Sequence, residues 1–213
     1  MLGLATIFLT SFIVGLSGAM MPGPVLTIAV SETYKKGFWA GPLIVLGHAV
    51  LELGLVVGIV LGLGKILGNN HVAGFIGIGG GLFLFWMGYD IARSAVKRGI
   101  KLDTQSSSSN SAFGPVIAGI TVSISNPYWT IWWITVGAGF VMKSLKYKFL
   151  GLSVFYGAHI MSDLIWYSLV SLAVVTGKKF LNNQIYRGIL TGCGIFLIGL
   201  AIFFTYSGIL FFR

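Results

Sequence analysis

Six long apolar runs divide the sequence, and this pattern constrains the fold more than any other feature. The runs cover residues 3–30, 39–64, 72–91, 112–142, 149–177 and 188–212. Each run is long enough to cross a bilayer as a helix, which takes about 20 largely apolar residues. With 56% hydrophobic and 9% charged residues, the chain lacks the polar surface of a water-soluble domain, which is about 25% charged. We therefore predict an all-α membrane protein with six transmembrane helices.

The basic residues indicate how such a chain is oriented. The formal net charge is +9, but Lys and Arg lie between the apolar runs instead of gathering in one patch, so no nucleic-acid partner is expected. The loops after the first, third and fifth runs hold nine Lys and Arg residues, against five in the other loops and the C-terminus. Because cytoplasmic loops are enriched in these residues, we predict a multi-pass protein of the cytoplasmic membrane with both termini outside.

The chain consists of two halves that resemble each other. We predict a first three-helix repeat over 1–92, a basic Ser-rich linker over 93–111, and a second three-helix repeat over 112–213. Pro24 and Pro127 each begin a P-x-x-T-I segment, and in both halves a histidine precedes a carboxylate by four residues. Because each repeat has an odd number of spans, the second enters the membrane from the opposite side. Two inverted repeats in one membrane domain are common in secondary transporters.

Both repeats begin with a run that we expect to be broken. Two prolines around a glycine interrupt the first run, and an Asn-Pro pair interrupts the fourth, where Asn126 can cap the resumed helix. A continuous helix over residues 112–142 would be roughly 46 Å long, against a hydrocarbon core of about 30 Å. Broken helices survive in a bilayer beside protein or a wet cavity, and their N-termini attract anions. We predict a substrate site lined by Pro22, Gly23, Pro24, Asn126, Pro127 and Trp129.

Two carboxylates, Glu52 and Asp163, lie well inside the predicted spans, and each follows a histidine by four residues. The pairs are His48 with Glu52 and His159 with Asp163, and this spacing places both members on one helix face. Ionisable side chains within a membrane indicate function by default. The pairs could carry protons or bind a substrate ammonium, could ligate a divalent metal ion such as Zn²⁺ or Mn²⁺, or could be structural hydrogen bonds between helices.

These motifs resemble the LysE/RhtB amino-acid exporter family over essentially the whole chain. The matching segments are residues 21–24, 37–41, 47–52, 81–88, 125–127 and 163–166. The resemblance implies an inner-membrane translocator that exports amino acids or related small molecules, driven by the proton gradient. Its signature positions are Pro22, Gly23, Pro24, Glu52, Asn126, Pro127 and Asp163. The chain departs from the family at Val25, where a polar residue is usual, and at Tyr128, where lysine is usual.

We predict a secondary active transporter, not an enzyme, that exports an amino acid or a similar small polar solute and is coupled to protons. The candidates for proton coupling or for binding a substrate ammonium are His48, Glu52, His159 and Asp163. The alternatives are a divalent metal-ion transporter that uses these four groups and, with less support, a membrane-embedded metalloenzyme. The expected partners are the small-molecule substrate, protons and membrane lipid. No cofactor is expected, and the sequence leaves open whether the chain forms a homo-oligomer.

Overall fold

The computed structural model describes residues 2–21, 23–62, 70–97, 113–177 and 183–212, and nearly all of them lie in helices. This part of the chain contains nine α-helices, one π-helical turn and no strand. The elements are α1 (Leu2–Ala19), α2 (Pro24–Lys36), α3 (Ala40–Val60), α5 (Asn70–Lys97), α6 (Phe113–Ile124), α7 (Pro127–Trp132), η1 (Trp133–Gly137), α8 (Ala138–Leu145), α9 (Lys148–Gly177) and α10 (Asn183–Leu210).

Four of these helices are long and apolar enough to cross a bilayer. The qualifying segments are Ala40–Val60, Gly74–Arg93, Lys148–Gly177 and Leu190–Leu210, in α3, α5, α9 and α10. Together α1 and α2 also qualify, as a pair bent by 73° at a short break. The predicted fourth run is instead a series of shorter helices, α6 to α8, because it is interrupted near its middle. The described part of the chain is therefore helical, and several of its helices are able to span a membrane.

The first predicted break is present between α1 and α2. Gly23 is extended, with φ −170° and ψ −169°, and the new helix begins at Pro24. Proline suits the first helical position because its missing N–H has no partner there in any case. Pro22, which was also expected to cause the break, lies outside the described residues. The interruption leaves the start of α2 facing the interior of the protein.

The second predicted break is present between α6 and α7. Asn126 is the N-cap of α7, and its Oδ1 accepts a hydrogen bond from the backbone N–H of Tyr128 at 3.1 Å. The predicted capping role of Asn126 is confirmed. After α7 the chain passes through the π-helical turn η1 before α8 begins. Such turns are rare and recur at functional sites.

Glycines bring α3 and α6 into close contact. A Cβ atom on Gly47 would overlap the carbonyl oxygen of Val116, and one on Gly119 would overlap the carbonyl oxygen of Ile44. Small residues commonly allow this close backbone approach between membrane helices. The crossing holds α6 against the part of α3 that carries its predicted functional residues.

We expect Gly119→Ala to lower the free energy of unfolding by about 1–3 kcal/mol, because the added methyl group overpacks the α3–α6 crossing. Gly54→Ala is the matched control, since Gly54 lies on the exposed face of α3 and an added Cβ would meet no described atom within 4 Å. Unfolding of the purified proteins in detergent measures both effects. Equal stabilities of the two variants would contradict the close crossing.

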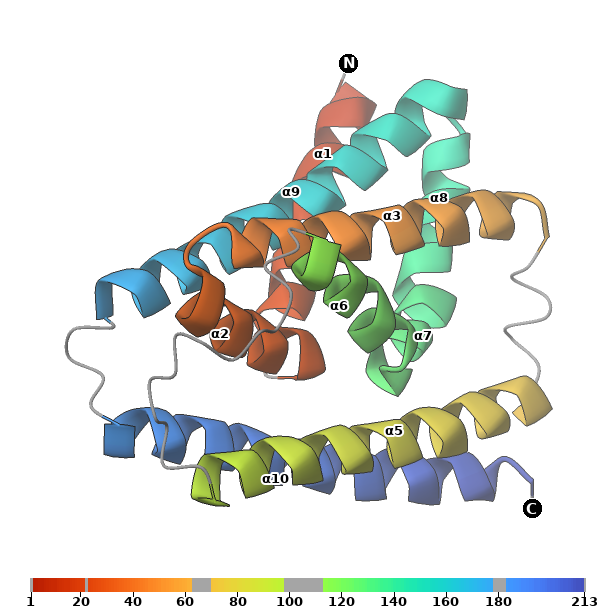
Figure 1. Cartoon of the computed structure of the whole chain (residues 1–213). Coiled ribbons are helices and arrows are strands. Elements are labelled where there is room, and N and C mark those ends of the chain that lie inside the picture. The colour runs from red at the N-terminus through yellow and green to blue at the C-terminus, as the bar shows by residue number, and fades with distance from the viewer. Residues whose placement is uncertain (1, 22, 63–69, 98–112, 178–182, 213) are drawn as a thin grey trace.

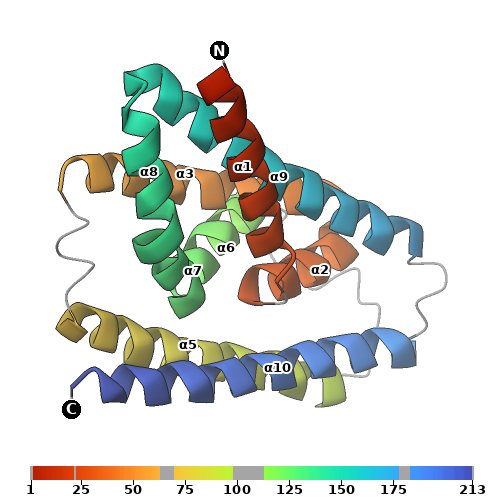
Figure 2. The same cartoon turned by 180° about the vertical axis from the view of Figure 1, so that it is seen from behind.

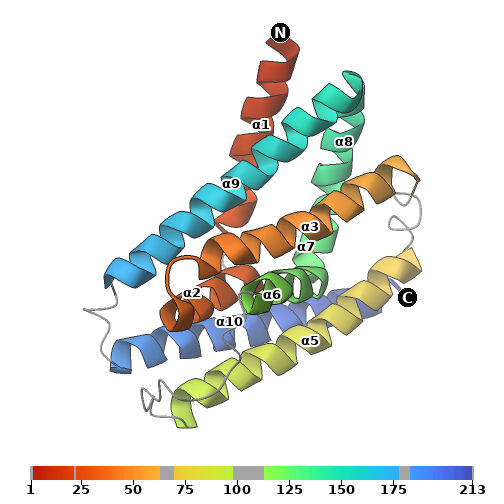
Figure 3. The same ribbon diagram turned by 45° about the horizontal axis from the view of Figure 1, so that its top comes forward.

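The helices α5 and α10 form a pair along one side of the molecule (Figures 1 and 2). A Cβ on Gly77 would lie 2.9 Å from the Cα of Gly208, and one on Gly88 would lie 2.7 Å from the carbonyl oxygen of Gly194. Glycine therefore allows close approach at two separate levels of this pair. Figure 3, seen from a tilted direction, again places the pair beside the other helices.

The C-terminal end of α5 extends beyond the predicted third run. Residues 93–97, assigned above to the linker, are helical, and residues 98–111 of that linker lie outside the described residues. Arg187 of α10 stabilises this extension, because its Nε and Nη2 each donate a hydrogen bond at 2.7 Å, to the carbonyl oxygens of Ala95 and Val96. Basic side chains near a helix C-terminus commonly satisfy its last carbonyl groups.

The buried apolar side chains form two clusters. The first contains Ile44 of α3, Leu84 of α5 and Leu197 of α10, all fully buried. The second surrounds Trp133 and Phe155, which are 0% and 1% exposed and meet edge to face at 6.1 Å between ring centroids. The His–carboxylate pairs of α3 and α9 are therefore held in place by packed helices.

Candidate functional site

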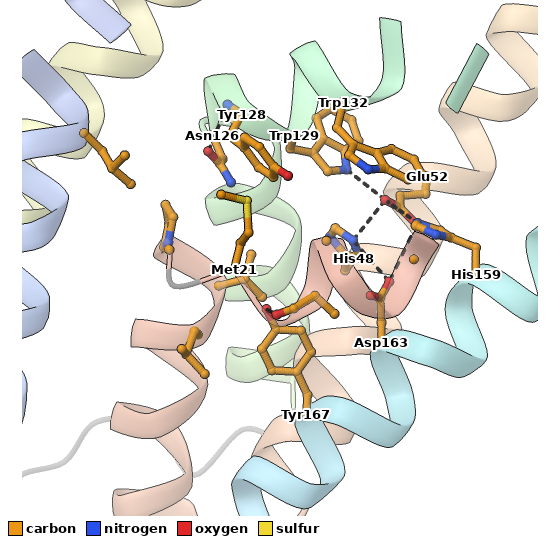
Figure 4. A pocket seen from close by; sticks show the side chains of 18 of the residues that line it. Met21, His48, Glu52, Asn126, Tyr128, Trp129, Trp132, His159, Asp163 and Tyr167 are labelled. Carbon is orange, nitrogen blue, oxygen red and sulfur yellow. Dashed lines mark hydrogen bonds and ion pairs between the residues drawn. The ribbon is translucent and has the colours of Figure 1, made fainter. Parts of the chain in front are cut away.

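Most of the predicted site residues border one pocket (Figure 4). Its volume is about 120 Å³, and its lining comes from α1, α3, α7, α9 and α10 and from the start of α2. The predicted residues that line it are Gly23, Pro24, His48, Glu52, Asn126, Trp129, His159 and Asp163. Both helix breaks and both His–carboxylate pairs therefore meet at the same space.

Two predicted site residues stand apart from this group. Pro22 lies outside the described residues. Pro127 is not among the described residues that line the pocket, and it packs against α5 instead, where a Cβ on Gly80 would lie 2.7 Å from its Cγ. In the structure, Pro127 starts α7 and contacts a neighbouring helix.

Glu52 is buried and closely surrounded by N–H donors. Its Oε1 accepts hydrogen bonds from the indole Nε1 of Trp129 at 2.9 Å and of Trp133 at 2.8 Å. His48 Nε2 lies 2.9 Å from the same oxygen, and His159 Nε2 lies 3.2 Å from Oε2. An ionised carboxylate in a buried site needs such partners, and Glu52 receives them from three different segments of the chain.

Trp133 belongs to this site but was not predicted. It is the first residue of η1, and Gly137 makes room for it, because a Cβ on Gly137 would overlap the indole ring. The spacing of four between Trp129 and Trp133 was the available signal, since residues four apart share a helix face. Without the position of Glu52 that spacing did not distinguish donors from lipid-facing rings.

Asp163 is also buried but has fewer partners than Glu52. Its Oδ2 lies 3.6 Å from His48 Nε2 and 3.8 Å from His159 Nε2, beyond hydrogen-bond distance. This oxygen has no hydrogen-bond partner in the described part of the chain. Buried polar atoms are nearly always paired, so an unpaired one needs an explanation. The two carboxylates that the sequence treats as equivalent are therefore in different environments.

The two histidines lie between the carboxylates and are held in different ways. His48 Nδ1 lies 2.6 Å from Ser123 Oγ on α6, which fixes the orientation of its ring. His159 stacks on Trp132, with 4.8 Å between ring centroids and 21° between planes. Its Nδ1 faces Gly15 of α1, where a Cβ would lie 2.8 Å away. Ser123, Trp132 and Gly15 had no assigned role in the sequence analysis.

We expect Ser123→Ala to lower the free energy of unfolding by about 1 kcal/mol, because hydrogen bonds between membrane helices contribute roughly 0.6–1.7 kcal/mol. The matched control is Ser17→Ala, since Ser17 is exposed on α1 and bonds only the nearby carbonyl of Val14 among the described contacts. Unfolding titrations in detergent compare the two variants. A Ser123→Ala protein as stable as Ser17→Ala would contradict the hydrogen bond to His48.

A metal ion is a weaker fit to this cluster than a hydrogen-bonded carboxylate. One ligand atom each from His48, Glu52 and Asp163 lie within 4.8 Å of one another, so these groups could close around a divalent cation. However, Glu52 Oε1 already accepts two indole N–H bonds, and indole nitrogen is a donor only. The partial positive charge of these N–H groups opposes a cation bound to the same oxygen.

The start of α2 forms another part of the pocket lining. Gly23 has no side chain with which to cap this helix, and Pro24 has no N–H group. The first backbone N–H groups of α2 therefore belong to Val25 and Leu26, which also line the pocket. A helix N-terminus with free N–H groups favours a negatively charged ligand group.

The last helix supplies an apolar wall that the sequence analysis did not anticipate. Phe196, Leu200 and Phe204 of α10 line the pocket. Their spacing of four places them on one face of the helix. This periodicity was a possible signal, but α10 is apolar on all sides, so the sequence alone did not show which face points inward.

A family model described as LysE type translocator matches residues 16–208. This range includes both helix breaks and both His–carboxylate pairs. The chain belongs to the LysE type translocator family. Members of this family are transporters and not enzymes, so the predicted family and the predicted absence of an enzymatic function are confirmed. This LysE-type translocator is a multi-pass membrane protein.

Two relatives align with the LysE-type translocator over almost its whole length. "Putative amino acid efflux protein YcgF" of Bacillus subtilis (strain 168) is 25% identical over 205 residues, which are 95% of this chain and 97% of the relative. "Chemotactic transduction protein ChpE" of Pseudomonas aeruginosa is 25% identical over 197 residues, which are 92% of this chain and 95% of the relative. No solved structure matches the chain.

Proposed function

We propose that this translocator exports an amino acid, or a similar small polar solute, in exchange for protons through the pocket between the two helix breaks. The observation that carries the proposal is the charge arrangement of that pocket. The buried Asp163 borders it, and so does the uncapped start of α2. These groups complement the ammonium and the carboxylate of a free amino acid, respectively. One relative is named as an amino acid efflux protein, which agrees with this substrate class.

Within the proposal, Glu52 is the fixed anion of the site. Two indole N–H groups and two imidazole nitrogens surround its carboxylate at 2.8–3.2 Å. A carboxylate with this many close partners keeps them throughout the transport cycle. Its role is to hold His48 and His159 in position beside Asp163.

Asp163 is then the group that a proton and the substrate share. A protonated Asp163 no longer attracts the substrate ammonium, and a bound ammonium displaces the proton. Because both cannot occupy the carboxylate at once, each transport cycle exchanges one for the other. Under an inward proton gradient this competition drives the substrate outward. His48 and His159, 3.6 and 3.8 Å from Asp163 Oδ2, are placed to relay the proton.

The helix packing supports a six-span arrangement of two inverted repeats, with residues 1–92 and 112–213 as repeats and 93–111 as linker. The first helix of each half packs on the second span of the other half, α1 on α9 and α6 on α3, and the last helices pack together as α5 and α10. In Figure 1, α3 and α10 run in one direction and α5 and α9 in the other. In this arrangement the α1–α2 pair and the α6–α8 series are the first and fourth spans.

We place both termini outside the cytoplasmic membrane in this proposal. The support is the excess of Lys and Arg, nine against five, in the loops that would then be cytoplasmic. A C-terminal alkaline phosphatase fusion, which is active only outside the cytoplasm, tests the orientation. An inactive fusion in a correctly inserted protein would reverse it.

Efflux from proteoliposomes tests the proposed function. Vesicles containing the purified protein are loaded with a mixture of labelled amino acids, and the external buffer is made acidic. We expect amino-acid efflux to be faster than at equal internal and external pH, and to fall back to the equal-pH rate when a protonophore collapses the gradient. Vesicles loaded with Zn²⁺ or Mn²⁺ are tested in parallel. Metal efflux without amino-acid efflux would contradict the proposal.

A further inference from the structure

We infer that the transported amino acid carries a large apolar side chain, of the kind found in leucine, methionine or phenylalanine, and that α10 recognises it. The inference rests on the proposed function and adds the substrate class. It depends on how charged and apolar groups are distributed around one pocket.

The ionisable groups of the pocket, tyrosines aside, gather at one end. Figure 4 shows His48, Glu52, His159 and Asp163 together, with the ribbon of α10 on the opposite side. All of these groups lie within 4 Å of a neighbour of opposite formal charge. A substrate ammonium that reaches Asp163 therefore directs the rest of the molecule away from this cluster.

Two features fix the orientation of the substrate backbone. Asp163 is 4% exposed, and its Oδ2 has no hydrogen-bond partner among the described residues, which suits it to receive an ammonium. The start of α2, with the N–H groups of Val25 and Leu26, suits the carboxylate. With both charged ends engaged, the side chain is the part that remains to face the rest of the pocket.

Most of that remaining surface is apolar, with Asn126, Tyr128 and Tyr167 as its polar members. Phe196, Leu200 and Phe204 form one face of α10, and Met21 and Tyr128 also line the pocket. None of the α10 residues that line it carries a charged or amide side chain. A cationic, acidic or hydroxyl-bearing substrate side chain that packs against α10 would lose its hydration without gaining a partner from that helix, which disfavours it. An apolar side chain gains by leaving water for the same surface.

The pocket volume limits the size of the substrate. About 120 Å³ is slightly less than the roughly 150 Å³ of an engineered apolar cavity that holds one benzene molecule. A branched or single-ring side chain is on this scale, and a peptide is not. The wall and the volume together select large apolar amino acids.

Counterflow in proteoliposomes tests the inference. Vesicles preloaded with unlabelled amino acid exchange with labelled leucine outside, and leucine, methionine, phenylalanine, alanine, threonine, lysine and glutamate compete at increasing concentration. We expect the three large apolar amino acids to compete at concentrations about 10-fold or more below those of threonine, lysine and glutamate, because a buried apolar wall rejects unpaired polar groups.

A matched pair of α10 variants tests whether the pocket-lining face of this helix determines substrate selectivity. Phe196 lines the pocket and is 41% exposed, so Phe196→Ala leaves most of the core intact, whereas Phe203 is 61% exposed and is not among the described lining residues. We expect Phe196→Ala to weaken competition by phenylalanine about 10-fold while leaving alanine unchanged. Phe203→Ala should behave as the unmodified protein. Leu200→Ala provides a second test at the next turn of the wall.

The outcomes separate the inference from the proposed function. Equal or better competition by lysine, threonine or glutamate would overturn the apolar substrate class and leave amino-acid export standing. An unchanged ranking in both Phe196→Ala and Leu200→Ala would overturn the role of α10. Absence of any exchange, with every amino acid also failing in the proton-driven efflux assay, would overturn the proposed function and the inference with it.

Discussion

Replacing Asp163 with asparagine is expected to abolish proton-driven export while leaving the protein folded. Asparagine has nearly the same shape but cannot take up the proton or balance a substrate ammonium. Loss of a hydrogen bond to a charged group costs about 1.5–3 kcal/mol, or roughly a 10- to 100-fold weaker substrate affinity. Stability should change little, because Asp163 Oδ2 has no hydrogen-bond partner to lose within the described chain. Efflux under an imposed pH gradient and detergent unfolding measure the two effects.

Asp90→Asn is the matched control for this prediction. Asp90 is exposed near the end of the apolar part of α5 and is not one of the described residues that line the pocket. The variant removes the same charge, so its export should equal that of the unmodified protein. If Asp163→Asn retains efflux that responds to the pH gradient, Asp163 does not carry the proton.

Replacing Glu52 with glutamine is expected to lower the free energy of unfolding by about 3 kcal/mol, because breaking a buried charge pair typically costs 3–5 kcal/mol. The neutral amide can accept the indole N–H bonds of Trp129 and Trp133 but no longer balances His48 and His159, and its own N–H₂ group meets donors. Export should be lost as well. Denaturant unfolding in detergent and efflux from the same preparation give both readouts.

Glu32→Gln serves as the control for this second prediction. Glu32 pairs with Lys36 at 2.9 Å at the end of α2, and Lys36 is partly exposed. Such pairs typically contribute no more than about 1 kcal/mol, so this variant should remain nearly as stable as the unmodified protein. Equal stability of Glu52→Gln and Glu32→Gln would show that the donors around Glu52 do not hold a charged group.

The two carboxylate substitutions distinguish an effect on protein stability from an effect on transport. Glu52→Gln should impair stability and export together, whereas Asp163→Asn should impair export alone. If both residues only made structural hydrogen bonds between helices, both substitutions would instead lower the free energy of unfolding. The two substitutions are therefore most informative when measured side by side.

Local chemistry explains what the sequence predicted well. A proline or an asparagine breaks or caps a helix through its own backbone and side chain, so the interruptions at Pro24 and Asn126 could be predicted from a few adjacent residues. The His–carboxylate pairs could be predicted in the same way, because a spacing of four is a property of a single helix.

The difference between Glu52 and Asp163 could not be predicted in this way. It depends on indole groups that reach Glu52 from a separate segment, at Trp129 and Trp133, and one of these sits in a π-helical turn. Nothing within α3 indicates which side chains of the fourth run will face it. Tertiary packing therefore decides which of two similar carboxylates receives the indole N–H groups.

Long-range contacts explain the other features that the sequence analysis missed. The extension of α5 to Lys97 is stabilised by Arg187, which lies in the last helix of the chain. The apolar wall of α10 lies within a run that is hydrophobic on every side, where periodicity cannot distinguish a lining face from a lipid-facing one. Both features required the placement of α10 against the other helices.

The pH inside proteoliposomes during amino-acid efflux tests the central claim most directly. Vesicles loaded with leucine and a pH-sensitive dye are diluted into leucine-free buffer of equal pH, with a potassium ionophore to prevent a membrane potential. Exchange of substrate for protons predicts that the interior acidifies as leucine leaves, and that Asp163→Asn vesicles show no acidification. Leucine efflux without any change of internal pH in the unmodified protein would contradict the account.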